Sequence, residues 1–258
     1  MNKIEETFSD QERNKLSVYF TAGFPNLDDT PLIMESIQRA GADLMEVGIP
    51  FSDPVADGAT IQASNTQALK NGICLKKILE QVGSIKEKIR IPVILMGYLN
   101  PVYQYGIEKF CTDAAAAGVS GVIIPDLPVK EYQDTYREIF DRSGLLNIFL
   151  ISPRTPDERI RMIDRQSRGF IYMVSASSTT GARKGISDTQ MAYFKRIDEM
   201  KLQHPRLIGF GISDHSSYVS ACRYAEGAII GSAFIRLLEN STDLEKDIIQ
   251  YIHSVKGN

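Results

Sequence analysis

The chain has 258 residues, of which 43% are apolar and 24% charged, so it can bury a sizeable core as one large α/β barrel or as two small domains. Its net charge of −3 argues against the strongly basic surface that gathers nucleic acid or an anionic membrane. The N-terminus is charged where a secretory signal would be apolar, and no run reaches the roughly 18 apolar residues of a membrane span. We therefore expect a cytoplasmic protein without a membrane partner.

Eight short apolar runs alternate with segments of helical spacing. In chain order, the predicted strands cover residues 16–23, 44–47, 92–98, 121–126, 145–152, 169–175, 206–211 and 227–232. Their apolar residues are continuous, which is typical of parallel strands covered by helices. No Pro/Gly-rich linker divides the chain, so we predict a single (β/α)8 TIM barrel domain over residues 1–258.

The helices of this barrel are predicted from apolar periodicity and capping patterns. A short amphipathic lead predicts an N-terminal helix, and we expect extra short helices after strands two and eight. A loop is expected between strand three and the helix that contains Ile107. The predicted caps, each at a helix start, are Thr30, Thr155, Ser213-Asp214 and Thr242.

The three cysteines are widely separated and lack CxxC spacing, which argues against a disulfide framework or a zinc site. Since free cysteine is usually buried, we predict buried free thiols at Cys74, Cys111 and Cys222.

Two carboxylates stand out, because barrel active sites lie at the carboxyl ends of the strands. Glu46 ends the apolar second strand, where an unpaired charge is costly, and Asp57 lies in the loop that follows. We expect the buried Glu46 to have the higher pKa and Asp57 to stay ionised. The structural alternatives are an ion pair for Glu46 and a helix cap or turn for Asp57.

Other catalytic groups are less well supported. No lysine ends a strand, and His204, His215 and His253 fall where they cannot converge with Glu46. We interpret Asp126, between two prolines, as a turn residue. Carboxylate acid/base chemistry without a metal is therefore the favoured mechanism.

Glycine-rich turns follow the last three strands. Gly209–Ser213 and Gly231–Ser232 lie where barrel enzymes commonly bind phosphate, and Gly181 comes from the strand-six loop. One such turn could be an ordinary tight turn, whereas the three together predict a phosphate site.

The run Glu46-Val-Gly-Ile-Pro-Phe-Ser-Asp-Pro-Val-Ala-Asp-Gly58, with Pro125–Pro128 and the two glycine turns, resembles the tryptophan synthase alpha subunit over essentially the whole chain. The resemblance implies a lyase that cleaves indole-3-glycerol phosphate, by a retro-aldol reaction, to indole and glyceraldehyde 3-phosphate. It also implies that Glu46 makes both proton transfers. Asp57 would hold the indole N–H while positive charge develops there.

Further substrate contacts follow from the same resemblance. Phe20 would line the indole pocket, and Thr180 would interact with Asp57 on closure. Tyr172 matches an active-site tyrosine, although the residue by itself fits either a hydrogen bond to the substrate or simple packing. The implied phosphate contacts are Gly181, Phe210, Gly211, Gly231 and Ser232.

The resemblance also implies a partner, a beta subunit carrying pyridoxal phosphate in an alpha2beta2 complex, and no cofactor in this chain. Packing over the substrate is the alternative role for the apolar residues that could contact it, Pro50, Phe51, Leu99, Pro101, Val102 and Tyr103.

The chain departs from the family pattern at two places, of which the altered strand-six loop bears on loop closure and partner signalling and Ala59 is the smaller change. The strand-six loop reads Ser175-Ala-Ser-Ser-Thr-Thr-Gly181, where an arginine and a Gly-Val-Thr-Gly ending are usual, and Ala59 stands where proline is common.

The alternative functions are a catalytically silent regulatory subunit and another phosphosugar barrel enzyme. Retention of Glu46 and Asp57 argues against the first, and the Asp53–Gly58 loop argues against the second.

Overall fold

The strands of the computed structural model, which describes residues 1–10, 12–55, 57–174, 187–209 and 211–257, form one parallel sheet. They are β1 (Lys15–Thr21), β2 (Leu44–Gly48), β3 (Val93–Met96), β4 (Gly121–Ile123), β5 (Leu146–Asn147), β6 (Phe149–Ile151), β7 (Ile171–Val174), β8 (Arg206–Gly209) and β9 (Gly227–Ile230).

The order of these strands closes the sheet into a barrel. Neighbours run β5-β4-β3-β2-β1-β9-β8-β7-β6, so β5 and β6 stand at the two ends of the order. Ile148 alone separates them in the chain, and its N–H donates to the Val122 carbonyl of β4 at 2.9 Å. β5 and β6 are therefore two parts of one strand, and the predicted eight-stranded barrel is confirmed.

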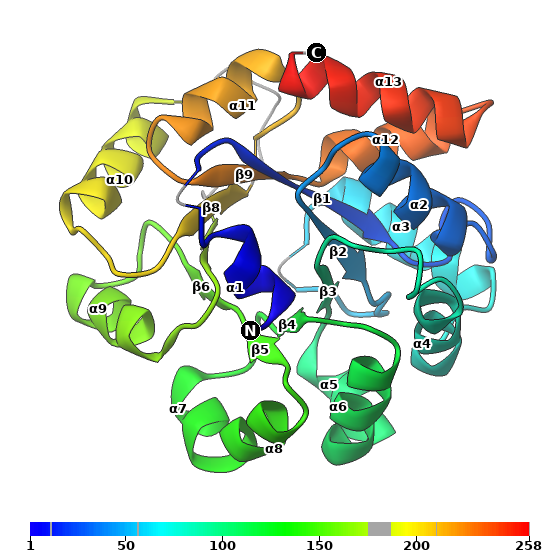
Figure 1. Ribbon diagram of the computed structural model, residues 1–258, viewed down its shortest axis with the longest axis horizontal. Helices are drawn as coiled ribbons and strands as arrows, with labels where there is room; N and C mark the ends of the chain where they lie inside the picture. Colours follow the sequence, from blue (N-terminus) through cyan, green and yellow to red (C-terminus); the bar gives the residue numbers. More distant parts are fainter. Residues whose placement is uncertain (11, 56, 175–186, 210, 258) are drawn as a thin grey trace.

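Apart from the N-terminal helix, which lies across one end of the barrel, the helices surround the strands on the outside, as Figure 1 shows. They are α1 (Lys3–Thr7), α2 (Thr30–Arg39), α3 (Ala59–Lys70), α4 (Leu75–Ser84), α5 (Leu99–Tyr105), α6 (Ile107–Ala116), α7 (Val129–Glu131), the π-helical η1 (Tyr132–Tyr136), α8 (Arg137–Arg142), α9 (Asp157–Gln166), α10 (Asp188–Glu199), α11 (His215–Cys222), α12 (Ser232–Asn240) and α13 (Leu244–Lys256). The extra helices predicted after strands two and eight are present as α3/α4 and α12/α13.

The N-terminal helix α1 closes one end of the barrel, in front of the strand ring in Figure 1. Its Ile4 is fully buried, and a methyl group added to Gly121, the first residue of β4, or to Gly169, two residues before β7, would overlap Ile4. The Asn2 amide donates to the Ser120 carbonyl at 2.8 Å. Because α1 covers the amino ends of these strands, the carboxyl ends form the accessible end.

Residues in β1 and β2 are buried throughout their length. One face of each strand packs inside the barrel and the other packs against helices, which explains the continuous apolar runs of the sequence. α2 and α4 follow the same principle, since their buried residues recur at helical spacing.

The prediction of a loop after strand three is wrong, because α5 occupies that segment. Pro101 lies in the first turn of α5, where its missing N–H leaves no helical hydrogen bond unmade. The Asp126 carboxylate accepts from the Leu99 N–H at 2.9 Å, so this residue supports the start of α5.

Three predicted caps are also wrong. The Thr30 hydroxyl accepts from the Gly23 N–H at 3.1 Å, and the Thr155 hydroxyl accepts from the Ser152 N–H at 2.9 Å, so both tie loops together. The start of α11 is as predicted, since Asp214 caps it. The residues at the caps of α2, α9 and α13 are Asp29, Pro156 and Asp243.

The prediction of buried thiols holds for Cys111 and Cys222 but is wrong for Cys74, which is exposed. Cys74 precedes the first buried residue of α4, where the side chain faces solvent. Within the described ranges, no helix combines the length and apolar character needed to cross a membrane.

Candidate active site

A cavity of about 280 Å³ opens at the carboxyl ends of the strands, where the sequence predicts the active site. Its lining comes from several strands and from the segments that follow them. The lining residues are Tyr19, Asp57, Ile61, Met96, Tyr172, Gly211, Ile212, Ser213, Ile229, Gly231, Ser232, Ala233 and Arg236.

Glu46 lies in the barrel interior and is 0% exposed. Its Oε1 accepts a hydrogen bond from the Ser17 hydroxyl at 2.8 Å, whereas Oε2 has no hydrogen-bond partner among the described residues. Burial raises the pKa of the Glu46 carboxyl to about 7, and the Ser17 hydrogen bond opposes this rise. The alternative of a structural ion pair is not seen, since no described cation contacts Glu46.

Glu46 is absent from the described cavity lining but lies next to it. Its charge contributes to the raised pKa values of both Tyr19 and Tyr172, after the larger effect of burial. These two tyrosines line the cavity, so the Glu46 carboxylate lies beside the tyrosines that border the open space.

Asp57 lines the cavity and is half-buried. Burial raises the pKa of its carboxyl to about 6, while hydrogen bonds from Asn65 and Tyr98 lower it. The Asn65 amide is 3.3 Å from Asp57 Oδ2. Helix α3 has Gly58 at its N-cap and no side-chain cap, so Asp57 is not the cap of α3. As expected, the buried Glu46 has the higher pKa of the two.

The two cavity tyrosines depend on glycines in neighbouring strands. A methyl group on Gly48 of β2 would overlap the Tyr19 hydroxyl, and one on Gly209 of β8 would overlap the Tyr172 hydroxyl. Glycine therefore allows each ring to lie across the adjacent strand inside the barrel.

Phe20, predicted to line the indole pocket, does not line this cavity. It is fully buried, and successive residues of a strand face opposite sides, so Phe20 faces away from its neighbour Tyr19. Tyr19, and not Phe20, is therefore the aromatic residue of β1 that lines the cavity.

The predicted phosphate residues that are described come together. Gly211, Gly231 and Ser232 line one cavity, and Ser232 is the first residue of α12. The N–H groups in the first turn of a helix lack helical partners and favour an anion. Thr180, Gly181 and Phe210 lie outside the described residues, as does the strand-six loop through Ile186.

Arg236 was missed by sequence reasoning. It lies one helical turn after Ser232 and lines the cavity, and its guanidinium donates to the Thr60 hydroxyl at 3.4 Å. The spacing of four residues within a helix, which puts both side chains on one face, could have identified it.

Of the predicted partner-contact residues, the structure buries Pro50 and Val102, leaves Phe51, Leu99 and Pro101 partly buried, and exposes Tyr103. Two of the three histidines lie in other contacts: His204 pairs with Asp164, and His215 contacts the Val255 carbonyl.

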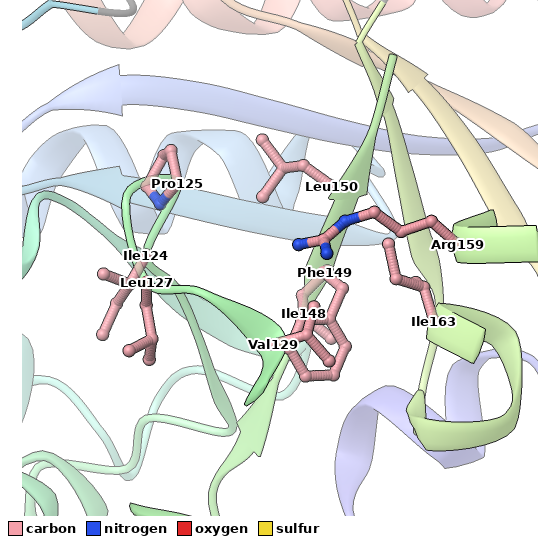
Figure 2. Close-up of a pocket in the computed structure, with 9 residues that line it drawn as sticks. All are labelled: Ile124, Pro125, Leu127, Val129, Ile148, Phe149, Leu150, Arg159 and Ile163. Atoms are coloured by element: carbon pink, nitrogen blue, oxygen red, sulfur yellow. The ribbon is translucent and has the colours of Figure 1, made fainter. Parts of the chain in front are cut away.

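A second hollow, of about 90 Å³, lies beside β4 and β6 (Figure 2). Its walls are apolar except for the Arg159 side chain, which extends over it from α9. Among the described residues that line it there is no carboxyl group, so acid/base chemistry belongs to the larger cavity.

Comparison with known proteins adds an independent finding. A family model described as "Tryptophan synthase alpha chain" matches residues 6–257. The tryptophan synthase alpha chain of Flavobacterium johnsoniae is 52% identical over 93% of this chain and 95% of its own length. That of Christiangramia forsetii is 50% identical over 100% and 99%. A crystal structure of the tryptophan synthase complex from Pyrococcus furiosus matches with a TM-score of 0.87 and 33% identity, covering 96% of this chain and 99% of that one.

Proposed function

The chain belongs to the tryptophan synthase alpha chain family, and on this premise we propose that Glu46 and Asp57 are the two carboxylates that carry out its reaction. The reaction is the cleavage of indole-3-glycerol phosphate to indole and glyceraldehyde 3-phosphate in tryptophan biosynthesis, and the chain is a carbon–carbon lyase. The observation that carries the assignment is the placement of the two carboxyl groups: Asp57 lines the cavity, and the fully buried Glu46 pairs in register with Tyr19, which lines the same cavity.

Glu46 begins the cycle as the acid. Its proton forms a bond to C3 of the indole ring, which leaves the ring as a cation with positive charge at N1. The C3–side-chain bond can break only after this step, because the cationic ring accepts the bonding electrons. The Glu46 carboxylate then removes the proton of the adjacent hydroxyl, the aldehyde forms, and indole leaves with Glu46 protonated again.

Asp57 stabilises the cation that forms between these two transfers. An ionised carboxylate that accepts the indole N–H attracts the developing positive charge more strongly than it attracts neutral substrate, so it lowers the barrier. The partly buried position of Asp57 strengthens this attraction. We assign the indole contact to Tyr19 and Tyr172, whose rings line the cavity beside Asp57.

These roles predict a bell-shaped pH dependence of kcat/KM. The active form has Asp57 ionised and Glu46 protonated, so activity should fall below about pH 6 as Asp57 gains a proton and above about pH 7 as Glu46 loses one. Indole release measured from pH 5 to 9 tests this. A profile that rises steadily through pH 8 would contradict the acid role of Glu46.

The phosphate of the substrate is assigned to Gly211, Gly231 and Ser232, with Arg236 as an added cation. Backbone N–H groups at the start of α12 suit an anion, and a guanidinium can bind phosphate oxygens in a bidentate manner. Since Arg236 also contacts Thr60 at the start of α3, it joins the phosphate end of the cavity to the helix that follows Asp57.

Arg236→Gln is expected to raise KM for indole-3-glycerol phosphate about tenfold with little change in kcat, because the phosphate is held equally in the substrate and the transition state. Steady-state kinetics of indole release measure this. Arg39→Gln is the matched control, since Arg39 lies on α2 and pairs with Glu245 at 2.6 Å. An unchanged KM in Arg236→Gln would remove Arg236 from the phosphate site.

We propose further that the chain works with a beta subunit that holds pyridoxal phosphate, in an alpha2beta2 complex, and that the chain itself uses no cofactor. The relatedness to the Pyrococcus furiosus complex supports this assembly. Two exposed apolar side chains also support it, Val55 in the Asp57 loop and Tyr103 on α5. The loop and α5 adjoin, since the rings of Phe51 and Tyr98 are 5.4 Å apart.

Direct transfer of indole to the beta subunit gives this assembly a physical motive, because indole is neutral and apolar and can leak through membranes.

We propose a cytoplasmic location, since the substrate is a phosphorylated intermediate of amino-acid biosynthesis. We also propose that residues 1–258 act as one domain, because each strand in the described part of the chain belongs to one closed sheet.

A further inference from the structure

We propose that Ser17 is a positioning residue for Glu46: its hydroxyl holds Oε1 and leaves Oε2 as the oxygen that carries the exchanged proton. The inference rests on the proposed function of Glu46. It adds a residue of β1 that the sequence analysis did not identify.

The geometry of this contact is specific. Ser17 and Glu46 are both 0% exposed and lie on adjacent strands, and their side-chain oxygens are 2.8 Å apart. Oε2 has no hydrogen-bond partner in the described part of the chain. The two oxygens of one carboxyl group are therefore in different situations, one held by a donor and one able to receive a proton.

A serine buried at this position of β1 needs a hydrogen-bond partner. The seven residues of β1 are all buried, and a buried hydroxyl costs free energy unless it is hydrogen-bonded. Its contact to a carboxylate is stronger than one to a neutral acceptor, which makes the charged form of Glu46 more accessible.

The other titratable groups around Glu46 do not replace this contact. Tyr19 on β1 and Tyr172 on β7 face it, and Asp57 acts on both tyrosines from the cavity side. The pKa values of both tyrosine hydroxyls are raised, so the hydroxyls stay neutral at physiological pH. Asp57 is itself a carboxylic acid, and its ionised form has no proton to donate to Glu46. Within the described residues, Ser17 is the group that opposes the effect of burial on Glu46.

The test is Ser17→Ala in the full chain. Without the donor, Glu46 should hold its proton more tightly, so the basic limb of the kcat/KM profile should move up by about one pH unit. A weaker acid should also lower kcat about tenfold, since protonation of C3 slows. Ser17→Thr retains the hydroxyl and should restore the wild-type profile.

A matched control separates this role from simple loss of a buried hydroxyl. Ser36 on α2 is 1% exposed and donates to the Leu32 carbonyl at 2.8 Å, so Ser36→Ala makes the same chemical change away from the cavity. We expect the control to keep both the wild-type kcat and the wild-type pH limbs. A basic limb and kcat that stay unchanged in Ser17→Ala would overturn the proposal.

A second measurement does not depend on activity. Carbon-13 NMR of glutamate-labelled, ligand-free protein, with Glu46→Gln to assign the signal, gives the pKa of Glu46 directly. A higher pKa in Ser17→Ala than in wild type supports the positioning role, and an equal pKa overturns it. If indole-3-glycerol phosphate were not cleaved at all, the proposed function would fail while this titration still reported on Ser17.

Discussion

Glu46→Gln is expected to lower kcat for indole release by more than about 10³-fold, because one general acid or base contributes 10²- to 10⁴-fold and this residue makes both transfers. Glutamine has nearly the same shape as glutamate but cannot exchange a proton at C3. The variant is assayed with purified protein and indole-3-glycerol phosphate, alone and with a beta subunit. We expect wild type to release indole slowly alone and much faster with the partner.

Stability measurements show whether Glu46→Gln remains folded. Folding raises the pKa of the buried Glu46 to about 7, so this group lowers stability as pH rises from its unfolded pKa to about 7. Removing it should therefore increase the free energy of unfolding above pH 7, by up to about 3 kcal/mol. Glu138→Gln, at an exposed position of α8, is the matched control and should keep full activity. Wild-type turnover by a folded Glu46→Gln would end the proton-transfer assignment.

The barrel could be predicted from the sequence because each strand is a continuous apolar run between helical segments. The break between β5 and β6 at Ile148 and the helix α5 could not, since both depend on local geometry that composition does not record. Pro101 illustrates the difficulty: proline is typical of a loop, yet it is equally compatible with the first turn of a helix.

The residues of the site likewise fall into those that could be predicted from the sequence and those that could not. Glu46 was identifiable because a carboxylate in an apolar strand is costly unless something uses it, and Asp57 because it lies in the loop that follows this strand. The inward-facing residue of β1 was not, because a strand buried on both faces shows no alternation that would distinguish Tyr19 from Phe20. Ser17 was missed for a related reason, since its contact with Glu46 depends on strand pairing across 29 positions of sequence.

Asp57→Asn is expected to lower kcat/KM about 10²-fold, an effect similar to removing one preorganised electrostatic contact from a transition state. Asparagine can still accept the indole N–H but carries no charge, so the loss measures the attraction between the carboxylate and the ring cation. Asp57→Ala should lose more, because it removes the acceptor as well. The acid limb near pH 6 should disappear from the pH profile of both variants, since it reports Asp57 itself.

Asp53→Asn provides the control within the same loop. Asp53 is exposed and accepts from Ser52 at 2.5 Å, and it is not among the described residues that line the cavity. Assayed without a partner, this variant should keep the wild-type rate and both pH limbs. An acid limb that persisted in Asp57→Asn would show that another group titrates near pH 6. The charge that stabilises the indole cation would then have to come from elsewhere, and the division of labour between Glu46 and Asp57 would be wrong.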